Sequence, residues 1–457
     1  MNIINITDLI DQSKLTKHQI WVLLLCALCM VVDGFDVQAM GYVAPAIIQD
    51  WGIAKADLGS VFGAGLIGMA LGALFLAPFA DKFGRRPVLI GAMFALSVCM
   101  AVTMMAESVQ ALVSYRFITG ICMGAIIPNC VTLAGEYSPT RFRVTLMMII
   151  SSGFILGGVL GGVLAAAIIP IWGWHSIFLT GAIAPLILAV VMLFKLPESL
   201  PFLTLKNRKP DVLKTWATRL GYVEPAGTES KFFVRESAKE GAPIAQLFKD
   251  NLALGTLMLW VVNFMNLLAA YFLANWLPVL MTEAGHAGSK AVLAGAVFWI
   301  GGLLGNLILG WFVDRRGFGW TLSLTFIGAA IAIAMIGQSA TTLSMAFLVI
   351  GAAGFCVLGA QTALNALGAV FYPTSVRSTG IGWALGVGRL GSILGPVLGA
   401  ELIRLNWSTP NLFLTVTIPV ILALIAILVF WKFGNLPTAA SHSAATHKKY
   451  KFEISMS

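Results

Sequence analysis

Charged residues are scarce in this chain. Asp, Glu, Lys and Arg make up 11% of the 457 residues, whereas apolar residues make up 58%. Soluble domains have about 25% charged and about 45–50% apolar residues. A soluble protein of this size could not hide so large an apolar excess from water. The composition therefore excludes a soluble enzyme, a nucleic-acid-binding protein and a disordered scaffold.

Histidine and cysteine are also few. The five His form no cluster suited to zinc, and the six Cys all fall in apolar runs. Cys26 and Cys29 have CxxC spacing, but within an apolar helix they act as small apolar side chains. No nucleophile–base set is apparent either. We therefore expect no metal, no cofactor and no enzymatic activity.

Long apolar runs are abundant. A spanning helix needs about 20 mostly apolar residues. Twelve runs qualify: 20–44, 58–80, 87–106, 110–136, 144–169, 174–195, 252–281, 290–313, 319–338, 342–371, 378–404 and 409–432. The expected fold class is an all-α membrane protein of 12 transmembrane helices in two six-helix halves. The expected divisions are an N-terminal half (1–195), a cytoplasmic central loop (196–250), a C-terminal half (251–433) and a disordered cytoplasmic tail (434–457).

The basic residues sort by loop. Of 29 Lys and Arg, 24 fall in the termini and in the loops on the same side, three fall in loops on the other side, and two fall inside spans. The positive-inside rule then places both termini in the cytoplasm. The net charge of +9 is thus an orientation signal at the lipid bilayer and not a nucleic-acid footprint. Within the central loop, Leu213, Trp216 and Leu220 follow helical spacing and predict a short helix at the membrane interface.

Two motifs recur along the chain. Gly72-x8-Asp81 returns as Gly305-x8-Asp314 in the second half. Pro139-Thr-x2-Arg143 returns there as Pro373-Thr-x2-Arg377. The two motifs recur at nearly the same offset along the chain, which indicates that the halves arose by duplication.

The Gly-x8-Asp-x2-Gly-Arg-Arg loop and the six-plus-six layout resemble the major facilitator superfamily over the whole chain. The resemblance implies a carrier that works by alternating access and functions as a monomer. It also implies that charges at the cytoplasmic ends of the helices form a gate of breakable ion pairs: Asp81, Arg85, Arg86, Glu136, Asp314 and Arg315. The alternative is that these charges only anchor the topology.

Four charged residues lie deeper in the predicted spans. Asp33 and Asp36 are on one face of the first span, and Asp36 and Arg116 have similar predicted depth and could pair. Arg389 lies near the middle of span eleven. Residues at the equivalent positions of the other half are uncharged, so these charges indicate the specific transport chemistry. Buried carboxylates suit proton coupling, and a buried Arg suits binding of a carboxylate. The alternative is a structural ion pair.

Polar and aromatic side chains accompany these charges. Spans seven, ten and eleven carry Trp260, Asn263, Asn266, Tyr271, Asn275, Trp276, Gln361, Asn365 and Trp383. Aromatic walls can stack on a flat ring and amides can bond hydroxyls. Of these, Asn263, Tyr271, Gln361, Asn365 and Trp383 are the predicted substrate contacts, together with Arg116 and Arg389. The alternative is that each of them anchors or packs its helix.

The segment Asp33-Gly-Phe-Asp36 and the run Arg389-Leu-Gly391-x3-Gly395-Pro396 resemble the aromatic acid:H+ symporter family. The resemblance implies uptake of aromatic carboxylates, such as 4-hydroxybenzoate and protocatechuate, together with H+ across the bacterial inner membrane. It assigns Asp33 and Asp36 to proton coupling. Alternatives are uptake of benzoate, vanillate or hydroxycinnamates, export of a drug or other solute, and a membrane sensor that binds an aromatic acid without moving it.

Overall fold

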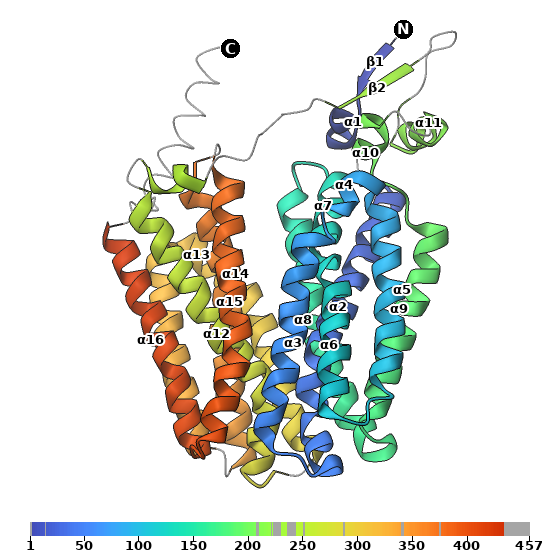
Figure 1. The fold of residues 1–457 in the computed structure, drawn as a ribbon. Coiled ribbons are helices and arrows are strands. Elements are labelled where there is room, and N and C mark those ends of the chain that lie inside the picture. Colours follow the sequence, from blue (N-terminus) through green and yellow to red (C-terminus); the bar gives the residue numbers. More distant parts are fainter. Residues whose placement is uncertain are drawn as a thin grey trace. The chain divides into compact units, whose positions relative to one another are not determined.

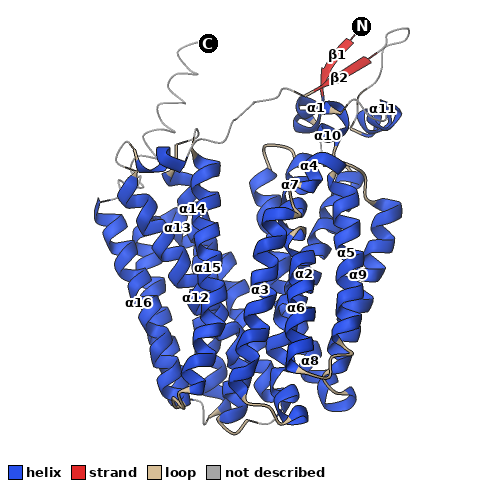
Figure 2. Cartoon of the chain, in the orientation of Figure 1, coloured by secondary structure: helices blue, strands red, loops and turns tan. Residues whose placement is uncertain are grey.

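The structure is a computed structural model that describes residues 2–13, 15–206, 210–220, 222, 230–234, 244–249, 252–286, 288–339, 342–373 and 376–433. Helices dominate the described residues, and the two strands pair with each other (Figure 2). The predicted tail, 434–457, lies outside the described residues. The chain divides into two compact units, residues 1–50 with 60–238 and residues 51–59 with 239–457.

In the first unit the membrane helices are α2 (Lys17–Trp51), α3 (Leu58–Phe75), α4 (Phe79–Phe83), α5 (Arg85–Thr103), α6 (Val109–Gly124), α7 (Ile126–Tyr137), α8 (Arg143–Trp172) and α9 (His175–Lys195). The remaining elements of this unit are β1 (Asn2–Asn5), α1 (Ile6–Gln12), α10 (Leu200–Leu205), α11 (Pro210–Arg219) and β2 (Ser230–Phe233). The strands β1 and β2 pair in parallel, with Asn2 opposite Ser230 and Asn5 opposite Phe233. These small elements gather at the end of this unit where α4 lies (Figure 1).

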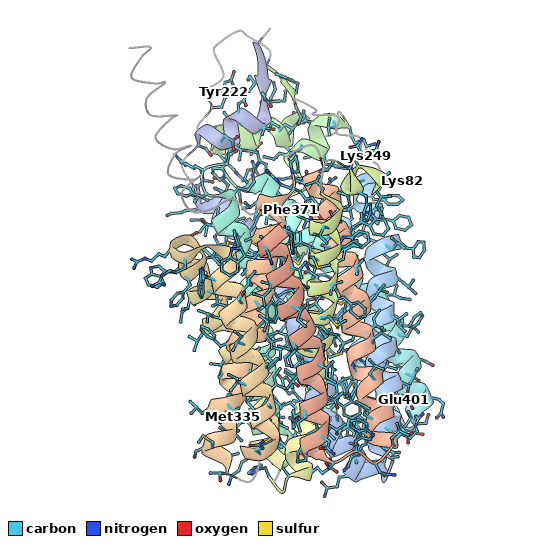
Figure 3. All side chains as sticks on the ribbon, turned by 90° about the vertical axis from the view of Figure 1, so that its left-hand side faces the viewer. Lys82, Tyr222, Lys249, Met335, Phe371 and Glu401 are labelled. Carbon is cyan, nitrogen blue, oxygen red and sulfur yellow. The ribbon has the colours of Figure 1, made fainter. Side chains whose placement is uncertain are left out.

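Among its described residues, the second unit has the short helices η1 (Lys55–Asp57) and η2 (Ile244–Phe248) and five long helices. The long helices are α12 (Ala253–Glu283), α13 (Gly288–Ser339), α14 (Leu343–Phe371), α15 (Arg377–Arg404) and α16 (Thr409–Phe433). In this unit Lys249 and Phe371 lie toward one end of the helices, and Met335 and Glu401 lie toward the other end (Figure 3).

Eleven helical stretches of the described residues are long and apolar enough to cross a membrane. Ten predicted spans each correspond to one of them, with ends that differ by a few residues at most places. The spans predicted at 290–313 and 319–338 fall together in α13, whose backbone leaves helical geometry at Gly317 (φ 79°). The prediction of a helical membrane protein is confirmed.

The surface of the helices is apolar where lipid would contact it. On α9, Leu179, Ile183, Ile187, Val190 and Phe194 are all exposed and recur every three or four residues. This spacing keeps them on one helix face. A stripe of large exposed apolar side chains is costly in water and favourable against acyl chains.

The duplicated glycines occupy equivalent places in the two units. A side chain at Gly72 would overlap the carbonyl of Ile121, and one at Gly305 would overlap the carbonyl of Phe355. The two contacted residues are separated along the chain by nearly the same offset as the two glycines. Each glycine thus allows two helices to approach closely at the same position of its unit.

Candidate functional site

A buried ion pair joins α2 and α6 in the first unit. Arg116 Nη1 donates to Asp36 Oδ1 at 2.8 Å, and Nη2 donates to Asp36 Oδ2 and to the Asp36 carbonyl, each at 3.1 Å. Only 5% of the Arg116 side chain and 2% of the Asp36 side chain are exposed. The two planar groups therefore meet in the bidentate geometry that binds guanidinium and carboxylate most strongly.

Two more polar side chains of α2 are buried near this pair in sequence. Asp33 is fully buried, one turn before Asp36. Gln38 is also fully buried, and among the described residues neither of its amide atoms has a hydrogen-bond partner. Gln38 is not among the residues expected from the sequence, although an amide two residues after Asp36 in a largely apolar run is a visible signal.

Glycines let α8 pack against this part of α2. A side chain at Gly34, between the two aspartates, would overlap the carbonyl of Phe154. One at Gly157 would overlap the carbonyl of Val31. This close backbone packing between α2 and α8 holds the Asp33–Asp36 turn in a fixed place.

The first set of predicted gate charges lies on α4, at the start of α5 and at the end of α7. Gly84 adopts φ 105°, which favours glycine, and so turns the chain between α4 and α5. Arg85 then lies 2.9 Å from Asp81 Oδ1 and 3.5 Å from Glu136 Oε1. Arg86 instead donates through Nη2 to the carbonyl of Leu193 at 2.5 Å. The structure brings three of the four predicted charges of this unit into one network.

Glu198, which is not among the residues expected from the sequence, is also a member of this network. Its Oε1 accepts from the backbone N–H groups of Arg85 at 2.8 Å, Arg86 at 3.2 Å and Ser199 at 2.9 Å. A carboxylate at the start of α5 satisfies donors that the helix leaves open and interacts favourably with the helix dipole. Tyr137 completes the contact by donating its hydroxyl to the Glu198 carbonyl at 2.7 Å.

The second set of gate charges is arranged differently. Asp314 and Arg315 are exposed, and no ion pair joins either to another described side chain. The Arg315 guanidinium lies over the Trp311 ring at 4.0 Å. The other repeated motif does match: Arg143 Nε donates to the Ser138 carbonyl, and Arg377 Nε donates to the Tyr372 carbonyl, both at 3.2 Å.

The expectation that residues 213–220 form a helix at the membrane interface is corrected in part. The helix exists as α11, but protein buries its apolar residues Leu213 and Trp216 and also Leu220, which directly follows the helix. The Trp216 ring meets Tyr137 edge-on at 5.1 Å. Helical periodicity predicts an apolar face but does not say whether lipid or protein covers it.

The second unit holds a network of side-chain amides between α12 and α14. Gln361 Nε2 donates to Asn263 Oδ1 at 2.9 Å and to Asn365 Oδ1 at 3.3 Å. Gln361 Oε1 accepts from Asn266 Nδ2 at 2.9 Å. Asn263 and Asn266 are buried, Gln361 is half-buried and Asn365 is exposed. Three of the predicted substrate contacts therefore lie side by side.

Two Trp side chains and one Arg side chain, carried by α12 and α15, belong to the same unit as the amides. Trp260 and Trp383 stack with ring centroids 5.8 Å apart and planes at 24°. Arg389 is half-buried, and no hydrogen bond or ion pair joins its guanidinium to any described residue. The residue before it, Gly388, packs close to Asn263. Tyr271 is buried on α12, and no described side chain is hydrogen-bonded to its hydroxyl.

Comparison with known proteins agrees with this architecture. The sequence profile of the Major Facilitator Superfamily matches residues 26–384 and 259–454. A gallate transporter of Pseudomonas putida is 39% identical over 426 residues, which cover 93% of this chain and 94% of that protein. The 4-hydroxybenzoate transporter PcaK of Pseudomonas aeruginosa is 38% identical, with 93% and 95% covered. The benzoate transport protein of Acinetobacter baylyi is 32% identical, with 93% and 92% covered.

Among solved structures, the fold is similar to that of a bacterial homologue of the human lysosomal transporter Spinster. The TM-score is 0.70 at 18% sequence identity, over 92% of this chain and 98% of that one. The family match, the similarity along most of the chain and the apolar helices lead to one conclusion: the chain belongs to the Major Facilitator Superfamily and is a multi-pass membrane carrier, not an enzyme.

Proposed function

We propose that the protein takes up aromatic carboxylates, such as 4-hydroxybenzoate and protocatechuate, together with H+ across the bacterial inner membrane. The observation that carries the substrate class is the similarity, at 38–39% identity over 93% of the chain, to transporters named for gallate and 4-hydroxybenzoate. Carriers of such acids need a cationic contact for the carboxylate and a stacking surface for the ring. The guanidinium of Arg389 and the Trp260–Trp383 stack supply both.

Proton coupling rests on the acidic residues of α2. In the structure Asp36 occupies the fork of Arg116, so Arg116 is not free to bind a substrate carboxylate. A proton added to Asp36 removes its charge and weakens this contact. Arg116, which stays charged, then becomes available to an incoming carboxylate. Proton binding at Asp36 and anion binding at Arg116 are thereby coupled through one ion pair, and Asp33 one turn away takes part in the same proton transfer.

The proposal includes twelve membrane spans, both termini in the cytoplasm, and a monomeric carrier that works by alternating access. At 1.5 Å per residue, the 52 residues of α13 would form a helix of about 78 Å, far longer than a membrane of about 30 Å. The break at Gly317 divides α13 into two spans of suitable length. The ion pairs of Arg85 with Asp81 and Glu136 form the gate of the first unit, and Asp314 and Arg315 take part in the second.

Uptake of labelled 4-hydroxybenzoate into membrane vesicles tests the proposal. We expect accumulation when the vesicle interior is made alkaline, and none after a protonophore collapses the proton gradient. Accumulation that survives this collapse contradicts symport. Asp33→Asn and Asp36→Asn should each abolish accumulation while the protein still inserts, whereas Glu107→Gln, which changes an exposed carboxylate, should not. Normal uptake by both Asp variants would remove their proposed role.

A further inference from the structure

In the amide network of the second unit, the orientation of each amide group is fixed, so that its donor end and its acceptor end are known. Asn263 Nδ2 donates to the Leu259 carbonyl at 2.8 Å. Asn266 Nδ2 donates to the Val357 carbonyl at 3.1 Å as well as to Gln361 Oε1. Backbone carbonyls can only accept hydrogen bonds, so they determine which end of each Asn amide is the nitrogen. Gln361 lies between the two and is oriented by both.

With the amides in this orientation, one buried acceptor has no hydrogen-bond donor in the described part of the chain. Asn266 Oδ1 is inaccessible to solvent and has no hydrogen-bond donor among the described residues. Exchanging the oxygen and nitrogen of this amide would not help, because an oxygen would then face two acceptors, the Val357 carbonyl and Gln361 Oε1. Nearly all buried polar groups in proteins find a partner, so an acceptor held open by its neighbours indicates a missing donor.

The neighbouring groups indicate what kind of molecule supplies the donor. Asn266 lies on α12, which also carries Trp260 of the aromatic stack and packs through Asn263 against Gly388, the neighbour of Arg389. The same helices therefore offer an aromatic surface, a cation without a partner among the described residues and a hydrogen-bond acceptor. A phenol with a carboxylate substituent has the three complementary groups: a ring, an anion and an O–H donor.

We propose that Asn266 Oδ1 accepts a hydrogen bond from a ring hydroxyl of the substrate. Asn266 is then a specificity-determining residue that makes the carrier prefer hydroxylated aromatic acids to acids without a hydroxyl. The inference rests on the proposed uptake of aromatic carboxylates. A site built to bond a hydroxyl discriminates strongly against analogues without it, because its own buried group is left unpaired.

Competition against uptake of labelled protocatechuate by the unmodified carrier is the first test. Protocatechuate has hydroxyls at ring positions 3 and 4, and 3,4-difluorobenzoate has a similar shape but no donor. We expect the difluoro acid to compete at least about 10-fold more weakly than unlabelled protocatechuate, the range expected for one buried hydrogen bond. Equal competition overturns the inference, since a water molecule then supplies the donor. Absence of any protocatechuate uptake contradicts the proposed function instead.

A variant locates the effect. Asn266→Leu keeps a similar volume but removes the acceptor. It should reduce the preference for protocatechuate over 3,4-difluorobenzoate to about 2-fold or less, mainly because protocatechuate then binds more weakly. Asn275→Leu is the matched control, because Asn275 is a buried amide of the same helix that donates to the Tyr271 carbonyl within that helix. It should keep the preference of the unmodified carrier. If Asn266→Leu keeps the preference, another residue contacts the hydroxyl and the inference is overturned. If Asn266→Leu fails to insert, the competition experiment on the unmodified carrier decides the question.

Discussion

Removing Asp36 from its ion pair should destabilise the carrier more than removing Asp36 and Arg116 together. In Asp36→Leu the Arg116 guanidinium stays charged and loses its two carboxylate contacts at 2.8 and 3.1 Å in a buried place. Breaking a buried pair in this way costs about 3–5 kcal/mol in free energy of unfolding. Replacing both partners by apolar residues, as in Asp36→Leu with Arg116→Met, is often nearly neutral.

Thermal unfolding in detergent measures the difference. A change of 1 kcal/mol shifts Tm by about 2–4 °C for 150–250 residues, so Asp36→Leu should lower Tm by roughly 6–20 °C. The double variant should return to within a few degrees of the unmodified protein yet fail to take up substrate.

An exposed ion pair of the same length provides the control. Arg404 Nη1 lies 2.8 Å from Glu401 Oε1, but 58% and 52% of these side chains are exposed, and Glu401 lies toward one end of the helices of its unit (Figure 3). Exposed pairs contribute about 0–1 kcal/mol, so Glu401→Leu should change Tm by less than about 4 °C. If Asp36→Leu lowers Tm no more than Glu401→Leu does, burial does not increase the contribution of the Asp36–Arg116 pair to the free energy of unfolding, and the reasoning is refuted.

Three further predictions concern packing and the end of the first unit where α4 lies. Gly34→Ala should prevent close packing of α2 against α8 and reduce the amount of folded protein severalfold. Gly91→Ala is the control, because a side chain at that position meets open space, and it should leave the amount of folded protein unchanged. The height of the monodisperse peak in size-exclusion chromatography measures the amount of folded protein. Glu198→Gln should lower Tm by a few degrees because a neutral amide is a weaker acceptor for three backbone N–H groups, and an unchanged Tm relative to Glu107→Gln would contradict that role. Trp216→Ala should make the region around it more accessible to protease, whereas equal digestion of both proteins would show that the aromatic contact does not hold α11 in place.

The spans were predictable because apolar length is a local property. A run of about 20 apolar residues has few alternatives to a membrane helix, whatever its neighbours. Local sequence separated the runs 290–313 and 319–338 but was insufficient to show that α13 leaves helical geometry between them at a single residue, Gly317. It was also insufficient at Trp216, because the same apolar face fits lipid and protein equally well.

The candidate site was predictable where chemistry alone singles out a residue. Charges such as Asp36 and Arg116 are so costly at membrane depth that their presence alone indicates a role. Glu198 carries no such signal, because it stands in a polar loop where carboxylates are common. Its importance comes from the backbone N–H groups that the fold brings to it.

By itself, the sequence determined a helical membrane protein with duplicated motifs and a few buried charges, because burial in lipid restricts composition strongly and locally. Only the tertiary structure decided which of those charges meet. It engages the Arg116 guanidinium and leaves that of Arg389 without a partner among the described residues. It also gives the amide network a direction and leaves Asn266 Oδ1 as an open acceptor. These features depend on contacts between helices that are far apart in the chain. The sequence of one helix does not determine the distances between its side chains and those of another helix.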